Sequence, residues 1–256
     1  MNPWIQTQTG KAFDLAAPTP AMVDPLDIAV RLARANRFSG STLRISVAQH
    51  SVMAAAAAWH QGFERERRAR LLALHDAAEA YIGDVFGPVR KLLTDMARTL
   101  VTGYADPRVV MNAPGSVFDL FGALDSRITD VIHVAFNIAR PTDPGAQVIR
   151  DYDQRQLAFE KIWFVQTPEP QPWWSGTTAP EPFTLDDYGG SLDDHRGLRV
   201  AKLVTETWDE EMAAGMYIEL LHRLGLLDGP WAMARARLTG YKAIEAIDLL
   251  FPVEPV

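Results

Sequence analysis

Apolar residues recur at helical spacing over most of the chain. In the first such segment, Ile28, Leu32 and Ala35 form an apolar stripe. Asp24 and Pro25 precede the stripe as an N-cap residue and a proline at the first helical position, and Asp27 adds negative charge to the first turn. The pattern therefore predicts a helix that begins near residue 25 and ends before Gly40.

Similar patterns predict further helices along the first two thirds of the chain. They cover residues 46–59, 65–82, a shorter stretch after Pro88, 117–139 and 145–164. Ser46 and Gln49 have the spacing of a capping box. Residues 4–14 instead alternate in polarity around Thr9-Gly10-Lys11, which predicts a short β-hairpin, and residues 103–115 hold the Gly and Pro of a loop.

The composition changes at residue 166, where prolines recur up to residue 182 and predict a linker. Two more helices are expected at 200–226 and 230–250, with an apolar stripe through Met212, Met216, Leu220 and Leu224. This stripe could pack on the core, or it could form a dimer interface or a lid. The prediction is an all-α fold with a main domain at 1–165, a linker and irregular segment at 166–199, and a helical extension at 200–256.

Composition narrows the classes of function. Hydrophobic residues make up 48% of the chain, enough for a sizeable core. With no cysteine, the chain has no disulfide, thiolate nucleophile or cysteine-based zinc site, and a reducing cytoplasm is expected. The net charge of −7 disfavours a nucleic-acid-binding surface. No apolar run reaches 18 residues and the first residues are polar, so neither a membrane span nor a signal peptide is expected.

Two polar residues, His75 and Asp76, interrupt one of the apolar helical patterns. Burying them is costly unless each has a partner. His50 lies on the preceding predicted helix and Asp125 on a later one. Two imidazoles and two carboxylates suit one divalent ion such as Mn²⁺, Co²⁺, Fe²⁺, Zn²⁺, Ni²⁺ or Mg²⁺, and four protein ligands leave octahedral positions open for water and phosphate oxygen.

The order His, His-Asp, Asp on successive helices resembles the HD superfamily of phosphohydrolases. Residues 37–40 (RFSG), 46–52 (SVAQHSV) and 74–84 (LHDAAEAYIGD) resemble its 5′-deoxynucleotidase (YfbR-like) branch, especially members from bacteriophages and prophages. Some of those members are dNTP triphosphohydrolases. The likeness covers residues 4 to about 163, is strongest between 37 and 91, and does not extend past residue 165.

This resemblance implies an HD-domain helical bundle and a role for each matching residue. The implied metal ligands are His50, His75, Asp76 and Asp125, although Asp119 and Asp130 are rivals for the last because the sequence around it diverges. The implied catalytic residues are Glu79 beside the attacking water, Arg37 on the phosphate and Asp84 near the sugar and phosphate. Substrate-binding residues would be Arg37, Phe38 at the base, Asp84, and Arg90 or Lys91 in a basic loop.

The expected activity is release of phosphate from deoxynucleoside monophosphates in the cytoplasm, which would be a host's cytoplasm for a phage protein. One alternative is release of triphosphate from dNTPs, because the motif cannot separate these two reactions. A second is an HD enzyme on another phosphate ester, and a third is a non-catalytic nucleotide-binding module. Related enzymes are commonly dimers, so a homo-oligomer is also an alternative to a monomer.

Overall fold

The computed structural model describes residues 3–40, 43–103, 118–165 and 179–252, and it is mostly helical with one small antiparallel sheet. The predicted hairpin is confirmed: β1 (Trp4–Gln6) pairs with β2 (Ala12–Asp14) so that Ile5 lies opposite Phe13. Asp27, fully buried at the start of the next helix, accepts hydrogen bonds from the backbone N–H and hydroxyl of Thr9 at 2.6 and 2.7 Å. Its role is therefore to attach the hairpin to the helical body.

The helices at the centre begin where the sequence predicts. Asp24 caps α1 (Pro25–Arg34) by accepting from Leu26 N at 3.0 Å, and Ser46 caps α2 (Val47–His60) by accepting from Gln49 N at 3.1 Å. Between them lies the short helix η2 (Arg37–Gly40). Nearly every residue of α2 is buried, and its run of alanines lets α1, α3 (Arg65–Leu74) and α10 (Glu210–Arg223) approach it closely.

The prediction of one continuous helix over residues 65–82 is wrong, because the structure has two helices there. Helix α3 ends at Leu74, residues 75–78 form a turn, and α4 (Glu79–Ile82) follows. The turn tightens to three-residue spacing, because Ala77 N donates to Leu74 O and Glu79 N donates to Asp76 O, at 3.1 and 3.0 Å. Apolar residues continue through this turn at almost helical spacing, so periodicity alone does not reveal the break.

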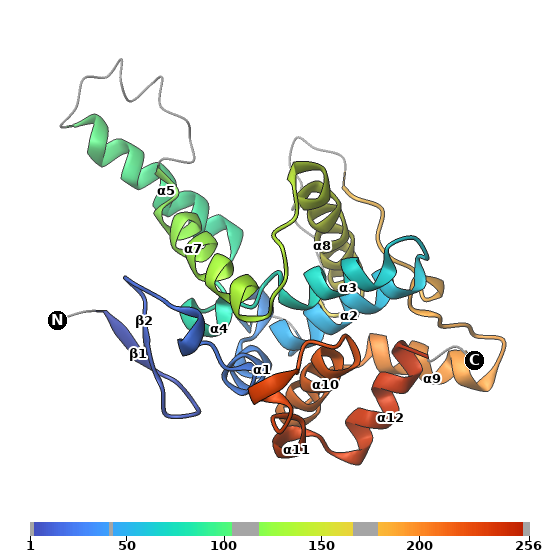
Figure 1. The fold of residues 1–256 in the computed structure, drawn as a ribbon. Coiled ribbons are helices and arrows are strands. Elements are labelled where there is room, and N and C mark those ends of the chain that lie inside the picture. Colours follow the sequence, from blue (N-terminus) through green and yellow to red (C-terminus); the bar gives the residue numbers. More distant parts are fainter. Residues whose placement is uncertain (1–2, 41–42, 104–117, 166–178, 253–256) are drawn as a thin grey trace.

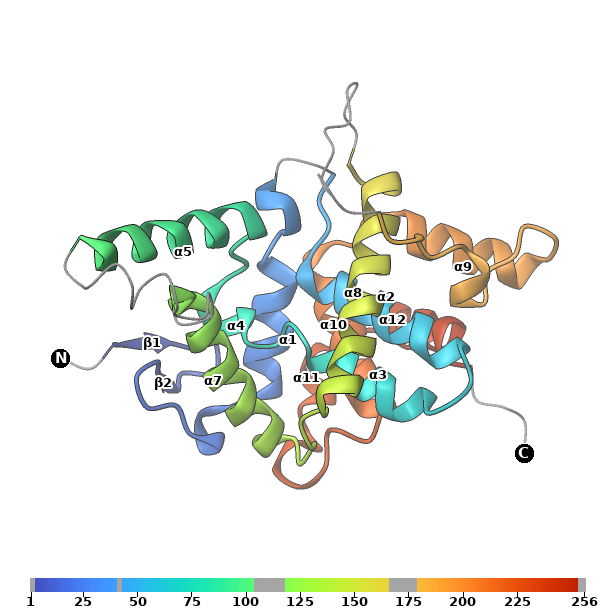
Figure 2. The same ribbon diagram turned by 90° about the horizontal axis from the view of Figure 1, so that it is seen from above.

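Two helices form an arm that projects from the body (Figures 1 and 2). These are α5 (Gly87–Thr102), longer than the short helix expected after Pro88, and α7 (Leu120–Ala135), shorter than expected. Arg90 and Asp119 join them in a salt bridge of 2.7 Å. Residues 104–117, which include most of the predicted loop, lie outside the described residues.

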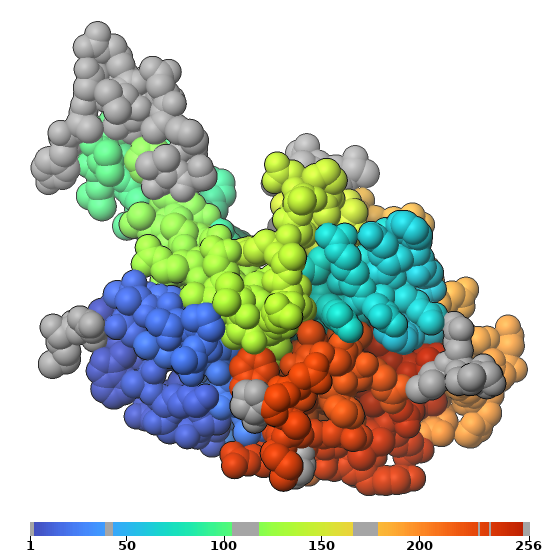
Figure 3. Space-filling view, in the orientation of Figure 1, coloured from blue at the N-terminus to red at the C-terminus, as the bar shows by residue number. Residues whose placement is uncertain are grey.

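Helix α8 (Asp143–Trp163) packs against α2 and α3. In the space-filling view, the surface is hollowed between the arm and α8 (Figure 3). The first part of the predicted linker, residues 166–178, lies outside the described residues. Helices α7 and α8 thus lie on either side of this hollow (Figures 1 and 3).

The C-terminal part is more divided than predicted. The helix expected at 200–226 is two helices, α9 (His195–Thr205) and α10 (Glu210–Arg223), because Asp209 caps a new helix by accepting from Met212 N at 2.8 Å. The helix expected at 230–250 is likewise divided into α11 (Arg235–Leu238) and α12 (Tyr241–Leu250), and the short helices η1 (Pro20–Met22), η4 (Asp186–Tyr188) and η5 (Gly229–Trp231) complete the fold.

Helix α10 fixes this C-terminal part to the body. It packs against α1, α2 and α3, and its side chains Met216 and Leu220, with that of the C-cap residue Leu224, are buried in the same core as α2. The side-chain amide of Gln49 pairs with the backbone just before α10, donating to Glu206 O at 2.8 Å and accepting from Trp208 N at 3.1 Å. No helix among the described residues is long and apolar enough to cross a membrane.

Candidate metal centre

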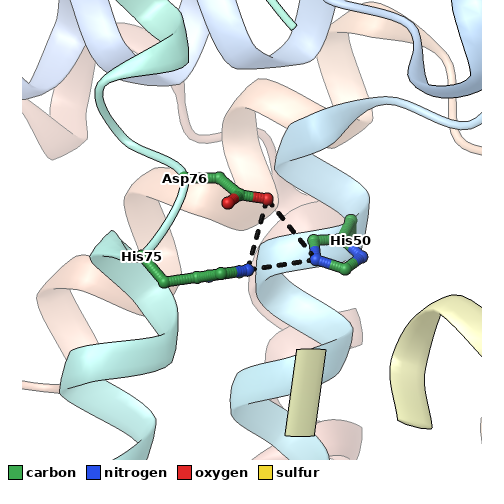
Figure 4. A group of neighbouring side chains, drawn as sticks. All are labelled: His50, His75 and Asp76. Atoms are coloured by element: carbon green, nitrogen blue, oxygen red, sulfur yellow. Dashed lines mark hydrogen bonds and ion pairs between the residues drawn. The ribbon is translucent and has the colours of Figure 1, made fainter. Parts of the chain in front are cut away.

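Three of the predicted ligands converge at the end of α3. His50 comes from the buried face of α2, His75 closes α3, and Asp76 begins the following turn (Figure 4). The two Nε2 atoms lie 3.1 Å apart, and Oδ2 of Asp76 lies 3.5 Å from Nε2 of His50 and 3.2 Å from Nε2 of His75. These three side chains form a group that could hold a metal ion.

The other nitrogen of each imidazole is already engaged. Nδ1 of His50 lies 2.5 Å from Oε1 of Glu160, and Nδ1 of His75 lies 2.6 Å from the backbone oxygen of Leu72, a carbonyl in the last turn of α3. Both acceptors require a proton on Nδ1 when the imidazole is neutral. The Nε2 lone pairs therefore point to the same place, which is the tautomer and orientation that metal-binding histidines usually adopt.

The charges around these imidazoles also suit a divalent ion. Asp76, Asp153 and Glu160 contact the histidines, and Arg37 is the cation that pairs with Asp76 and Glu160. Three carboxylates and one guanidinium leave a net charge of about −2 when the imidazoles are neutral. A divalent cation would balance this charge, so the residues present fit the ion that the sequence predicts.

Without an ion, the same carboxylates favour protonated imidazoles. Burial and Arg37 lower the pKa of His50, but Glu160 and Asp153 outweigh them, so the net pKa is raised. The pKa of His75 is raised well above its usual value because Asp76 and Asp153 overcome the effect of burial. An ion at this site would have to displace those protons, which makes its binding dependent on pH.

Glu160 and Arg37 form a second layer behind the histidines. Glu160 is fully buried on α8, and Arg37 in η2 donates to its Oε2 from Nε at 2.9 Å. Nη1 of Arg37 also lies 3.4 Å from Oδ2 of Asp76. Burial opposes the charge of Arg37, but Glu160 and Asp76 together raise the pKa of its guanidinium, so Arg37 is a permanent cation beside the site.

The sequence analysis missed two acidic residues on α8, Asp153 and Glu160. Oδ1 of Asp153 lies 3.2 Å from Nε2 of His50 and 3.8 Å from Nε2 of His75. Asp153, Gln156 and Glu160 recur at helical spacing on a helix whose Tyr152 and Phe159 are buried. This polar stripe on an inward face was the signal in the sequence, because buried carboxylates need partners.

Glu79 begins α4, three residues after Asp76. Burial, together with the charges of Asp76 and Asp84, raises its pKa to about 10, so the ion-free protein holds it protonated at neutral pH. Among the described residues, its buried Oε2 has no hydrogen-bond partner. A buried polar atom without a partner is costly, and a water or substrate oxygen at the site would satisfy it.

Two other predicted residues lie near this group. Burial raises the pKa of Asp84, while the charge of Arg37 acts to lower it and that of Asp76 to raise it, so Asp84 lies within electrostatic reach of both. Phe38 adopts a positive φ of 55°, an uncommon conformation for a bulky residue, and the Arg37 guanidinium carbon lies 5.8 Å from its ring centre. The roles predicted for these side chains toward substrate stay predictions.

The predicted fourth ligand, Asp125, lies on α7 and outside the trio whose atoms are within 4.8 Å of one another. Burial and the charge of Asp76 raise its pKa, which places it within electrostatic reach of the site. Its two rivals are engaged elsewhere: Asp119 caps α7 and pairs with Arg90, and Asp130 pairs with Arg140 at 2.7 Å.

The basic pair after Pro88 faces acidic partners on the arm. Arg90 donates to both carboxylate oxygens of Asp119, and Lys91 pairs with Asp95 one turn later at 2.6 Å while its side chain is 76% exposed. A separate open hollow of about 610 Å³ lies between the start of α3 and the end of α7, where it is lined by Arg65, Arg70 and Asn137. It contains none of the candidate residues.

Comparison with known proteins adds little to this picture. No family model matches the chain. An uncharacterized protein of Rhodobacter capsulatus is 31% identical over 141 residues, which is 53% of this chain and 59% of that relative. The chain thus spans less than two thirds of the relative's length, and the relative's name states no activity.

Proposed function

We propose that this chain is a metal-dependent phosphohydrolase of the HD superfamily that hydrolyses deoxynucleotides, with deoxynucleoside 5′-monophosphates as its main substrates. One observation carries the proposal: the Nε2 atoms of His50 and His75 and a carboxylate oxygen of Asp76 lie within 3.5 Å of one another, and both Nδ1 atoms bind elsewhere. The choice of phosphate ester rests on the resemblance of residues 37–91 to 5′-deoxynucleotidases.

The reaction would cleave the bond between phosphorus and the 5′ oxygen of the sugar. Water attacks phosphorus, the P–O5′ bond breaks, and the leaving oxygen takes a proton, which gives a nucleoside and inorganic phosphate. A divalent ion bound at the site would act as a Lewis acid on the phosphoryl group and increase the acidity of water. Proton transfer and stabilisation of the phosphoryl charge would depend on the side chains around the ion.

Glu79 would handle the proton. Its buried carboxyl group lies beside Asp76 and is uncharged in the ion-free protein, and the charge of a bound cation would favour its ionised form. It could then take a proton from the attacking water and pass a proton to the leaving oxygen. A positioned acid or base of this kind typically accelerates a reaction by about 10²–10⁴-fold.

Arg37 would stabilise the charge that builds on the phosphoryl oxygens. Its guanidinium is held between Glu160 and Asp76, so it is oriented before substrate arrives. Phe38 follows it directly and would contact the base, and Asp84 would contact the sugar and phosphate. Arg90 or Lys91 would help to bind phosphate only after leaving the acidic partner that each now has.

A substrate panel tests the proposal. Protein reconstituted with Mn²⁺ or Co²⁺ is incubated with dNMPs, dNTPs and ribonucleotides, and the products are separated by chromatography. We expect nucleoside and phosphate from dNMPs. Nucleoside and triphosphate from dNTPs would instead identify a triphosphohydrolase. Absence of turnover on every substrate, in protein shown to retain metal, would contradict the proposal and favour a non-catalytic nucleotide-binding module.

A further inference from the structure

We propose that two copies of this chain associate through α5 of the arm, with one apolar stripe of each helix packed against the other. This stripe, here called the α5 stripe, consists of Val89, Leu92, Leu93, Met96 and Leu100. The inference depends neither on the metal centre nor on the proposed activity.

The α5 stripe is exposed, although it has the pattern of a helix face that is normally covered. None of the 16 residues of α5 is buried, and Leu92, Leu93, Met96 and Leu100 are 57%, 48%, 52% and 63% exposed. An amphipathic helix of a globular protein usually turns such a stripe toward the core. Among the described residues, nothing covers this one, so another molecule is needed to bury it.

Helix α5 is joined to the rest of the arm through polar groups rather than through the stripe. Arg90 pairs with Asp119, and the guanidinium carbon of Arg98 lies 5.3 Å from the ring centre of Phe118. No helix among the described residues packs extensively along α5, and the arm projects from the body in both ribbon views (Figures 1 and 2). An isolated helix of about this length is only marginally stable in water. A partner on the stripe would therefore stabilise the helix itself.

The spacing of the stripe indicates which partner fits. Val89, Leu93, Met96 and Leu100 follow one another at intervals of four, three and four residues, which is the seam of a coiled coil. Such a seam packs best against a seam of the same kind. A second copy of the chain supplies an identical one, and a two-fold axis brings the two together.

The charges of α5 allow this pairing. Lys91 and Asp95 each lie two residues from Leu93, about 200° around the helix axis, so they stand on the opposite face, where they pair with each other at 2.6 Å. Two uncharged stripes can therefore meet without bringing like charges together. The net charge of −7 on the whole chain disfavours the alternative of an anionic membrane surface.

The exposed area suits a weak dimer. Together with Phe86, the exposed residue before the helix, three leucines and Met96 expose on the order of 100 Å² each, so two copies would bury about 1,000 Å². This area is close to the lower limit of a specific interface. We therefore expect a dissociation constant on the order of 1–100 μM, so that monomer and dimer coexist in that range.

Sedimentation equilibrium of the full chain at about 1–100 μM tests the pairing. Leu93→Glu puts a charge into the stripe of both copies at a position that is exposed in the monomer, so the fold should persist, as circular dichroism can check. We expect its dissociation constant to rise at least about 10-fold. The control Thr102→Glu makes the same change of charge at an exposed position on the opposite face of α5, and it should stay within about threefold of wild type.

Cross-linking gives a second measurement that needs no disruptive substitution. Because the chain has no cysteine, single cysteines report on one position at a time. Val89→Cys, Leu93→Cys, Met96→Cys and Leu100→Cys are oxidised mildly and separated on non-reducing gels. We expect a disulfide-linked dimer from at least one of them, because a disulfide forms where two Cα atoms come within about 7 Å. Thr102→Cys should remain monomeric.

Three results would overturn the proposal. The first is wild-type protein that is monomeric at every concentration. The second is a wild-type dimer that Leu93→Glu leaves intact, which would assign the contact to another surface. The third is a monomer that binds vesicles of phosphatidylcholine and phosphatidylglycerol and loses that binding in Leu93→Glu, which would make lipid the occupant of the stripe.

Discussion

Nδ1 of His50 on α2 and Oε1 of Glu160 on α8 lie 2.5 Å apart, although 110 residues separate them in the chain. Both side chains are fully buried, and Oε2 of Glu160 accepts from Arg37 at the same time. The carboxylate thus fixes the orientation of one imidazole and of the guanidinium that would bind phosphate. A single buried residue therefore connects the candidate metal ligand His50 with Arg37, the proposed phosphate-binding residue.

Glu160→Gln should weaken metal binding without removing a ligand. Removing the negative charge behind a metal-binding histidine reduces the basicity of its ring and typically lowers metal affinity 10–100-fold. The same substitution leaves Arg37 with one carboxylate partner, so we also expect a higher KM for substrate. Calorimetric titration with Mn²⁺ measures the first effect and steady-state kinetics the second. Wild-type values for both would show that the charge of Glu160 supports neither metal binding nor substrate binding.

The central part of the fold is readable from the sequence because local signals agree there. Asp24, Pro25 and Ser46 sit at helix starts that the structure confirms, and Gly10 has the positive φ of 88° that the hairpin turn requires. The break after Leu74 was not readable. His75 binds a carbonyl of the last turn of α3, and this capping by a side chain leaves no mark on apolar periodicity.

The candidate site was partly readable for a similar reason. His50, His75 and Asp76 stand in stretches with strong local patterns, and the structure brings them together. Asp153 and Glu160 depend on how α8 docks on α2, which is a long-range relationship that no local window contains. Their polar stripe on α8 is visible in the sequence, but its place beside His50 is known only when the packing of α8 on α2 is known.

Glu79→Gln should separate chemistry from metal binding. We expect turnover to fall about 10²–10⁴-fold because the glutamine amide cannot act as a general acid or base, while Mn²⁺ content stays at the wild-type level. Asp76→Asn is the comparison, since it should lose both metal and activity. Metal content is measured by atomic spectrometry after dialysis. Equal metal loss in the two variants would show that Glu79 is a ligand rather than an acid or base.

Asp125→Asn tests the fourth ligand that the sequence predicts. If Asp125 binds the ion, Mn²⁺ affinity should fall about 10-fold or more. Removing a residue that only hydrogen-bonds to a metal ligand already lowers metal affinity about 10–100-fold, and removing a ligand should cost at least as much. Asp130→Asn is the matched control, because that residue lies on the same helix but is exposed and paired with Arg140. Equal affinity in Asp125→Asn and Asp130→Asn would show that the predicted ligand is wrong.

Gln49→Leu tests how firmly the C-terminal part is attached to the body. Leucine has a similar size, but it would leave Glu206 O and Trp208 N without their side-chain partner. An unsatisfied buried group costs about 1–3 kcal/mol, so we expect the free energy of unfolding in urea to fall by at least about 1 kcal/mol. Gln147→Leu on the exposed face of α8 should change it little. Similar urea midpoints for the two variants would show that the hydrogen bonds of Gln49 contribute little to the stability of the fold.

His133 should make the fold sensitive to acid. Burial and the nearby charge of Arg140 lower its pKa to about 4, against about 6.5 in an unfolded chain. Below pH 6.5 the unfolded chain therefore binds more protons at this position than the folded one, and stability is lost as the pH falls toward 4. His133→Phe removes this effect, so its urea midpoint should decline less steeply than that of wild type between pH 6.5 and 4. His195→Gln, at an exposed position, should follow wild type, and parallel curves for wild type and His133→Phe would contradict the prediction.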